Sequence, residues 1–95
     1  MSWYTAKCRF RSIHTGEEPP HETVGEYRFF LLKADNEEGA RDKAQIISKR
    51  KEHSYKNKYG ATVSWCFESV VDVKEVIDGG FVEGTEIYSE YFPIT

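Results

Sequence analysis

The sequence predicts a single two-layer α+β domain, in which one helix packs on one face of a four-stranded, mainly antiparallel sheet. Three observations predict this fold: strand-like alternation in residues 2–13, a helical stripe in the middle of the chain, and a long alternating run in residues 61–76. With two further strands, at residues 25–34 and 84–92, the element order is β-β-α-β-β. A chain of this length supports one hydrophobic core, so residues 1–95 are expected to form one domain.

The first predicted strand spans residues 2–13, where apolar and polar side chains alternate with the period of two that is typical of a half-buried strand. Its apolar side is predicted to carry Tyr4, Ala6, Cys8 and Phe10. An acidic loop with two adjacent prolines leads to the second strand, GEYRFFLLKA at residues 25–34. The apolar run Phe29–Leu32 covers both sides of that strand, which predicts a sheet that is covered on both faces near its centre.

The helix is predicted at residues 34–54, ADNEEGARDKAQIISKRKEHS. Asp35 and Glu38 have the spacing of a capping box, with a carboxylate in place of the usual hydroxyl. The apolar stripe of this helix consists of Ala40, Ala44 and Ile47. Because the two alanines are small, the helix is expected to lie close to the sheet.

A long strand is predicted at residues 61–76, ATVSWCFESVVDVKEV, with one face formed by Val63, Trp65 and Phe67. Val71 continues this face and Val70 is out of phase, which predicts a bulge or strong twist near Ser69–Val71. A hairpin turn at IDGG then leads to the last strand, at residues 84–92. The favoured strand order is 2-1-3-4, which keeps all neighbours antiparallel, and the alternative is 1-2-3-4 with one parallel pair.

Charge and composition argue against several classes of function. The net charge of −3 at pH 7 disfavours non-specific attraction to nucleic acid or to a membrane. No apolar run approaches the roughly 20 residues that span a bilayer, and the N-terminal MSWYTAKCRF lacks the continuous apolar stretch of a signal peptide. A cytoplasmic protein without membrane contact is therefore expected, with Cys8 and Cys66 packed as small apolar residues.

No motif for a cofactor, a metal or catalysis stands out, so no cofactor, no metal and no catalytic residue is expected. Histidine and glutamate residues do gather in the first loop: His14, Glu17, Glu18, His21 and Glu22. Their spacing is a weak pattern for a metal site, because glutamate-rich loops are usually just solvated. Nothing in the spacing of Cys66 and His53 supports a nucleophilic pair, which makes an enzyme the less favoured hypothesis.

One stretch, KRKEHSYKNKYG at residues 49–60, is strongly basic within an acidic chain. Its candidate anion-binding residues are Lys49, Arg50, Lys51, Lys56 and Lys58. One interpretation is an RNA-binding patch in which Tyr55 and Tyr59 stack on bases. A second is a solvated helix end whose cations suit the negative end of the helix dipole. A third is that the basic patch meets the acidic C-terminal hairpin, in the same molecule or in a partner.

A single helix covers one face of a four-stranded sheet and leaves the other face open. The candidate residues for an interface on that open face are Trp3, Phe29 and Leu31. Large apolar groups there favour dimerisation, since a two-fold symmetric pair is the commonest assembly. The alternative is that the twisted sheet curls round the helix and the long loop covers the rest.

Three segments of the chain stand out together: WYTAKCRF near the start, HSYKN–YG–TVSWCFESVVDV in the middle, and GTEIYS near the end. In combination they resemble DUF4288, a family of small bacterial domains of unknown function, over most of the chain. The most specific part of the resemblance is a motif of His53, Ser54, Tyr55, Asn57, Gly60 and Trp65. The resemblance implies a compact single domain and no known activity. From the residues themselves, the favoured role of this motif is a structural lock that holds the helix exit on the long strand.

The favoured hypothesis for function is a small non-enzymatic interaction domain, which forms a homodimer or binds another protein through the open sheet face. One alternative is an RNA-binding accessory protein that uses the basic helix end. Another is a small ligand-binding protein or hydrolase built around His53, Tyr55 and Trp65, which requires a pocket at the helix exit.

Overall fold

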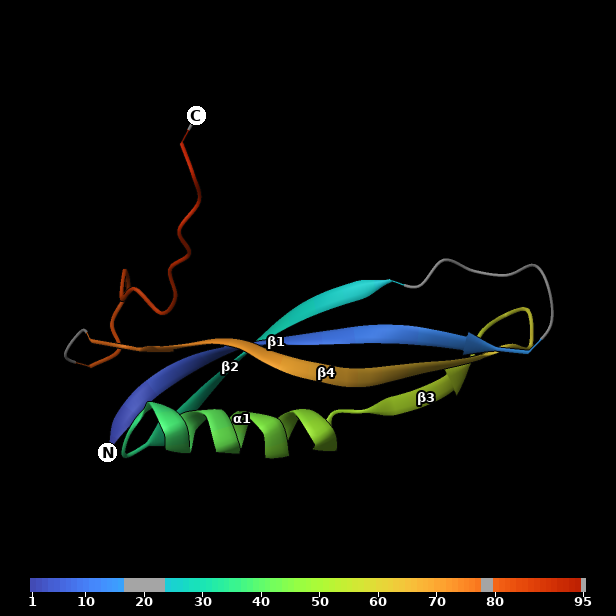
Figure 1. Ribbon diagram of the computed structural model, residues 1–95, viewed down its shortest axis with the longest axis horizontal. Helices are drawn as coiled ribbons and strands as arrows, with labels where there is room; N and C mark the ends of the chain where they lie inside the picture. Colours follow the sequence, from blue (N-terminus) through green and yellow to red (C-terminus); the bar gives the residue numbers. More distant parts are fainter. Residues whose placement is uncertain (17–23, 78–79, 95) are drawn as a thin grey trace.

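The computed structural model describes residues 1–16, 24–77 and 80–94. Its elements in chain order are β1 (Ser2–Thr15), β2 (Gly25–Ala34), α1 (Glu37–Arg50), β3 (His53–Lys56) and β4 (Thr62–Glu75). The four strands form one antiparallel sheet in the order β2-β1-β4-β3, and α1 lies on one face of it (Figure 1). The predicted α+β class and the element order β-β-α-β-β are therefore confirmed. No helix in the described part of the chain is long and apolar enough to cross a membrane.

The fourth strand is not the one that the sequence predicts. The segment His53–Lys56, which the sequence assigns to the helix exit, pairs with β4, whereas residues 84–92 form no strand. The predicted order is therefore right for the three long strands and wrong for the fourth position, which β3 occupies. A local hairpin has the advantage here, because closing a short loop costs less entropy than bringing in a distant segment. The predicted IDGG turn lies partly outside the described residues.

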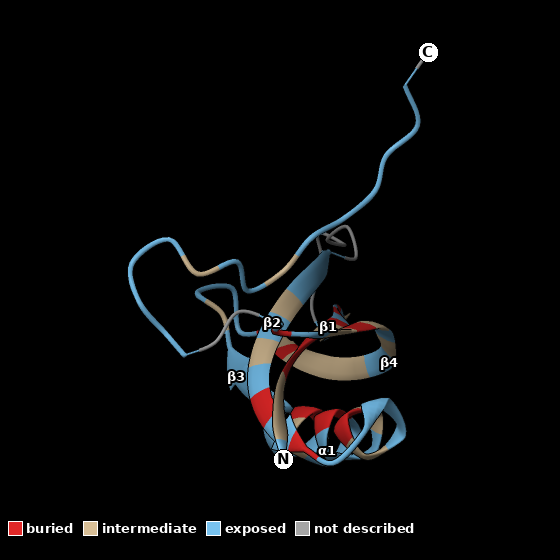
Figure 2. Ribbon diagram, turned by 90° about the vertical axis from the view of Figure 1, so that its left-hand side faces the viewer, coloured by how far each residue is buried: buried red, intermediate tan, exposed pale blue. Residues whose placement is uncertain are grey.

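The hydrophobic core lies between α1 and the sheet face that α1 covers, which we call the helix face. It contains the residues predicted for β1, all of them buried: Tyr4, Ala6, Cys8 and Phe10. The fully buried positions of α1 are all small, which lets the helix approach the sheet closely (Figure 2). They are Ala40, Ala44 and Ser48. The predicted stripe is right for the two alanines, and Ile47 is half-buried at its margin.

The helix is shorter than predicted at both ends. Its N-cap is Asn36 rather than Asp35, and the Asn36 Oδ1 accepts a 2.8 Å hydrogen bond from the Gly39 backbone N–H. A Cβ at Gly39 would lie 3.3 Å from that oxygen, which gives a reason for a glycine in the first turn. After the other end of α1, the Glu52 carboxylate accepts a 2.9 Å hydrogen bond from the Phe67 N–H, which brings the chain alongside β4.

β4 contains the bulge that the sequence predicts near Ser69–Val71, because the pairing with β1 skips Val71. The predicted phase is wrong, however: Val70 continues the helix face and packs against the core, whereas Val71 is the bulged residue and is exposed. Arg41 of α1 donates a 3.1 Å hydrogen bond to the Val70 carbonyl, so the helix is tied to the bulged part of the strand. A second irregularity skips Glu68. Both bulges lie in the part of β4 that runs alongside α1 and increase the local twist of the sheet.

The sheet extends well beyond the helix. β1, β4 and α1 each have 14 residues, but 14 residues span about 46 Å in a strand and only about 21 Å in a helix. Beyond the C-terminal end of α1, the sheet continues as an arm that consists of the β3–β4 hairpin and the neighbouring part of β1 (Figure 1). The molecule is correspondingly elongated, with extents of 51 × 37 × 25 Å.

Candidate functional site

Three of the six motif residues hold the β3–β4 hairpin together. The Asn57 side-chain oxygen accepts hydrogen bonds of 3.0 and 3.1 Å from two backbone N–H groups of the turn. Gly60 has a φ of +83°, a left-handed conformation that glycine adopts without strain. Across the hairpin, the Ser54 Oγ lies 2.8 Å from the Ser64 Oγ. These contacts give Ser54, Asn57 and Gly60 a structural role in the hairpin.

The other three motif residues, His53, Tyr55 and Trp65, lie on the helix face of the arm. His53 pairs with Trp65 across the hairpin, and the rings of His53 and Tyr55 are stacked with centroids 6.1 Å apart. Both of these rings are exposed, and the His53 Nδ1 lies 3.2 Å from the Lys51 carbonyl oxygen. Cys66 follows Trp65 in β4 and projects from the opposite face, so His53 and Cys66 do not form a nucleophilic pair.

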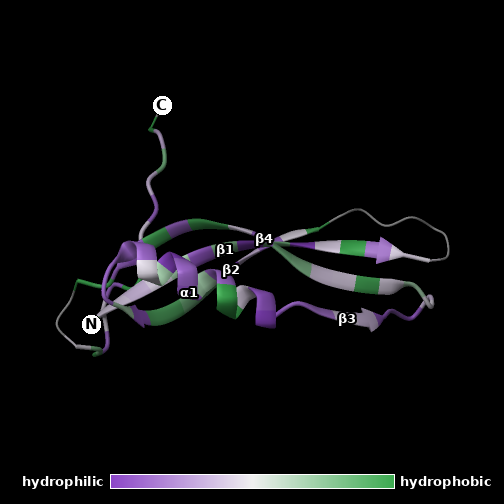
Figure 3. Ribbon diagram, turned by 60° about the horizontal axis from the view of Figure 1, so that its bottom comes forward, coloured by the Kyte–Doolittle hydropathy of each residue, from purple (hydrophilic) through white to green (hydrophobic). Residues whose placement is uncertain are grey.

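The five candidate anion-binding residues do not gather on one surface. Three of them lie at the C-terminal end of α1, while Lys58 lies in the hairpin turn with its Nζ 5.2 Å from the centroid of the Tyr59 ring. Lys56 follows Tyr55 in β3, so the two side chains project from opposite faces. Figure 3 shows that the hydrophilic region extends from the end of α1 to β3. The cations are thus spread along the edge of the arm, and Lys56 is separated from the exposed ring next to it.

Most candidate metal ligands of the first loop, Glu17, Glu18, His21 and Glu22, lie outside the described residues. His14 lies near the end of β1 and is half-buried. Within residues 1–16, 24–77 and 80–94, no three histidine, cysteine or acidic side chains converge as the ligands of a metal ion would.

The face opposite α1, which we call the outer face, carries a row of large apolar side chains on β2. Alternation along the strand places Tyr27, Phe29 and Leu31 there, and each of them is about half exposed. The structure therefore brings the predicted Phe29 and Leu31 together, and the same period of two identifies Tyr27, which the prediction missed. Trp3 lies on the same face at the start of β1, where it pairs with Lys33.

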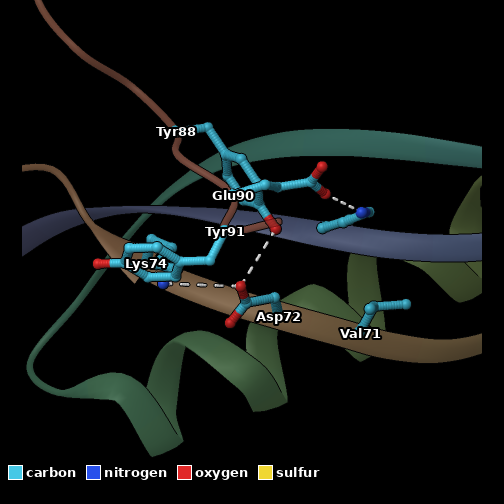
Figure 4. A pocket seen from close by; sticks show the side chains of 7 residues that line it. Val71, Asp72, Lys74, Tyr88, Glu90 and Tyr91 are labelled. Atoms are coloured by element: carbon cyan, nitrogen blue, oxygen red, sulfur yellow. Dashed lines mark hydrogen bonds and ion pairs between the residues drawn. The ribbon is translucent and has the colours of Figure 1, made fainter. Parts of the chain in front are cut away.

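Residues 80–94, the C-terminal segment, cross the outer face and cover part of it (Figure 4). Phe81 packs edge-on against Trp3 with ring centroids 5.3 Å apart, and Tyr88 packs in the same way against Phe29 at 4.8 Å. Glu90 and Tyr91 still contact Lys7 and Lys74, and beyond them the segment leaves the body of the molecule and is exposed (Figure 2). Aromatic contacts, rather than strand pairing, therefore hold this segment against the sheet.

A pocket of about 390 Å³ lies between the C-terminal segment and the sheet (Figure 4). Its lining carries charges of both signs, and these are paired: Lys7 with Glu90, and Lys74 with Asp72. The Tyr88 hydroxyl donates a 3.4 Å hydrogen bond to the Asp72 carboxylate. Because opposite charges already neutralise each other, the pocket is better described as the contact between segment and sheet than as a prepared site for an ionic ligand.

The contact between Tyr88 and the sheet depends on a protonated hydroxyl. Burial, and secondarily the neighbouring Asp72 carboxylate, raise the pKa of Tyr88 to about 12. The folded state therefore favours the protonated form, so this contribution to stability is complete below pH 10 and is lost as the pH rises towards 12. In an ultraviolet titration we expect a tyrosinate that forms near pH 12 in the wild type and is missing from Tyr88→Phe. Coincident titrations of the two proteins would show that Tyr88 is not docked.

Cys8 belongs to the core and not to a reactive site. The residue is fully buried on β1. Burial raises the pKa of the Cys8 thiol, and the Ser48 hydroxyl and Arg41 lower it by smaller amounts. A buried thiol with a raised pKa is a poor nucleophile, so the structure supports the packing role expected for Cys8.

One family model matches the part of the chain that contains the hairpin, the long strands and the helix. This model, described as "Domain of unknown function (DUF4288)", matches residues 3–89. The chain belongs to this family. The DUF4288 match includes all five elements, apart from the first residue of β1, and most of the C-terminal segment. No curated protein and no solved structure matched the chain in the corresponding searches.

Proposed function

We propose that this DUF4288 domain is a non-enzymatic interaction module that forms a homodimer through the outer face of its sheet, with the interface centred on β2. The observation that carries the proposal is the row of Tyr27, Phe29 and Leu31. Each of these residues remains about half exposed although the C-terminal segment covers part of the same face. Contiguous apolar side chains on one exposed strand are a feature of protein–protein interfaces.

The exposed apolar area on this side supplies about half of what a stable dimer interface requires. Three aromatic residues there are exposed to 50%, 52% and 91%: Tyr27, Phe29 and Tyr91. Together they offer roughly 400 Å² of surface, against roughly 800 Å² per partner in a stable interface. Leu31, which is also half exposed, adds to this area. A two-fold pair is the commonest way to cover such a surface.

The two alternative functions have weaker support. An RNA-binding protein needs cations and stacking rings on one surface, but Lys56 and Tyr55 project from opposite faces of β3. A ligand-binding protein or hydrolase at the helix exit needs a pocket there. Two pockets found in the described part of the chain, of about 390 and 250 Å³, lie beside the C-terminal segment and are lined by no residue of the helix exit. The outer face is therefore the better supported functional surface.

Leu31→Lys is expected to convert the homodimer into a folded monomer, because a lysine in the centre of an apolar interface must lose its hydration. Light scattering at high micromolar concentration should give twice 11.0 kDa for the wild type and 11.0 kDa for the variant. Leu31 is a better position for this test than Trp3, since Trp3 packs against Phe81 within the same chain. Its replacement would disturb the monomer itself.

Ile46→Lys is the matched control for this experiment. Ile46 is exposed to nearly the same extent as Leu31, 54% against 50%, but lies on α1 and therefore on the other side of the sheet. This variant should remain dimeric. A wild type that scatters as a monomer would refute the homodimer, and loss of the dimer in both variants would show an effect of charge that is not specific to the outer face.

A further inference from the structure

β2 is an edge strand with only one of the usual protections against pairing with another strand, the inward-facing charge of Arg28. It is outermost in the sheet, and all ten of its residues pair with β1 in an unbroken register. Natural edge strands are commonly short, or interrupted by a bulge, a proline or an inward-facing charge. β3, at the other edge, has only four residues, whereas β2 has ten and contains no proline.

The charges near the β2 edge are occupied within the chain. Arg28, on the helix face, forms an ion pair with Glu26, and its guanidinium group lies over an aromatic ring of the core. At the C-terminal end of the strand, the Lys43 ammonium group donates a hydrogen bond to the Lys33 carbonyl. Among the described residues, the stretch 26–32 forms backbone hydrogen bonds with no segment other than β1. This stretch is therefore open to a further strand.

We infer that two copies of this chain join edge to edge, with β2 of one copy antiparallel to β2 of the other and Phe29 facing Phe29 on the two-fold axis. This inference rests on the proposed homodimer and places its contact at the backbone edge of β2, where the two rows of outer-face apolar residues come to lie side by side. In this register Tyr27 faces Leu31 on the outer face, so each exposed apolar residue of the row meets another one. On the helix face, Arg28 faces Phe30, and no like charges are opposite each other.

Neighbouring registers of the same pairing are less favourable. An axis at Arg28 places two guanidinium groups opposite each other, which is destabilising. An axis at Phe30 moves Tyr27 opposite Lys33 and extends the pairing into the part of the edge where Lys43 binds the Lys33 carbonyl. The register centred on Phe29 avoids the facing guanidinium groups and the contact with Lys33, and it lies within the open stretch 26–32.

Edge-to-edge pairing also explains why the two edges of the sheet differ so much in length. The two four-stranded sheets become one continuous sheet, and the long edge of β2 disappears from both copies. The edges that remain are the short β3 strands, which are exposed and polar. Short polar edges of this kind resist further strand addition, so the assembly stops at two copies.

Amide hydrogen exchange, followed by NMR together with light scattering, distinguishes edge pairing from the homodimer in general. In a single copy, alternate N–H groups of β2 point away from β1 into water and exchange rapidly. In the edge-to-edge dimer they join the ladder, so exchange of these amides in residues 27–31 should slow at least about tenfold as the mass doubles with concentration. A dimer in which they are unchanged would overturn edge pairing and leave the homodimer standing. A monomer at all concentrations would overturn both.

Cysteine cross-linking tests the register. In a Cys66→Ser background, oxidation of Phe29→Cys should link two copies, because residues that face each other on antiparallel strands have Cα atoms about 4.5–5.5 Å apart. Leu31→Cys is the matched control. Its counterpart in the second copy lies four residues further along the strand, about 13 Å away, so it should remain unlinked. Linking of Leu31→Cys alone would overturn the register, and linking of neither variant in a dimeric protein would overturn edge pairing.

Discussion

Phe10→Ala is expected to lower the free energy of unfolding by about 3–5 kcal/mol, a large share of the roughly 5–15 kcal/mol that stabilises a small domain. Phe10 is the largest fully buried side chain among the described residues. Its ring lies between those of Phe30 and Phe67, with centroids 6.4 and 5.7 Å away. Phe30 is held in β2 and Phe67 in β4, the two strands that flank β1. The cavity that alanine leaves can therefore collapse only in part. Urea unfolding monitored by tryptophan fluorescence measures the change.

Phe81→Ala is the control for this experiment, because it removes the same side chain from a position that is 46% exposed. We expect it to cost no more than about 1 kcal/mol. Both variants should be compared with the wild type at one protein concentration, since dimerisation stabilises the folded state by mass action. A loss below about 1 kcal/mol in Phe10→Ala would show that the sheet is not packed around this ring.

Ala44→Leu is expected to destabilise the protein by about 1–3 kcal/mol through overpacking between α1 and the sheet. Ala44 is fully buried in the core between α1 and the sheet, in the middle of the small residues that bring the helix close. Leucine and alanine have similar helix propensities, so the loss arises from packing and not from the helix itself. In a domain of this size, each 1 kcal/mol lowers the melting temperature by about 4–8 °C.

Gln45→Leu is the control that separates overpacking in the core from the general effect of adding a leucine side chain to α1. Gln45 is the next residue of α1 and is exposed, so the same leucine there should change stability by less than about 0.5 kcal/mol. Calorimetry of the two variants checks the difference. A rise in the melting temperature of Ala44→Leu would show that space remains between the helix and the sheet, contrary to the close approach that the small residues indicate.

The long strands and the helix could be predicted from the sequence, because an element that is buried on one side has apolar residues at regular intervals. Alternation predicts β1 and its buried residues, and the break in phase at Val70 and Val71 predicts the bulge. The N-cap at Asn36 instead of Asp35 shows the usual limit, since adjacent residues that can both cap a helix are not distinguished by spacing alone.

β3 could not be predicted in this way, because all four of its residues are exposed and leave no apolar alternation. The signal that was present is the turn chemistry of Asn57 and Gly60, which the prediction assigned to the helix exit. Conversely, residues 84–92 are rich in residues that favour strands, but the edge of β4 with which they were predicted to pair is already occupied by β3. The segment instead docks through Phe81 and Tyr88 on the outer face.

The candidate surfaces were predictable to the same extent as the strands that carry them. Phe29 and Leu31 share a face because β2 is correctly predicted, and parity along a strand determines which side chains are neighbours. The prediction that grouped Lys56 with Tyr55 on one surface failed because β3 was not predicted to be a strand. On a helix end or in a loop the two could share a surface, whereas in β3 they alternate.

The arm beyond the helix and the extended C-terminal segment together have a hydrodynamic consequence. The radius of gyration of the Cα atoms is 16.7 Å, whereas a compact chain of this length has about 12 Å and a compact chain of twice the length about 16 Å. A single copy should therefore diffuse and elute from a sizing column much as a globular protein of double its mass does. An early elution volume can therefore result from the elongated shape of the monomer as well as from dimerisation. A sedimentation coefficient that rises with protein concentration, in contrast, results from dimerisation only.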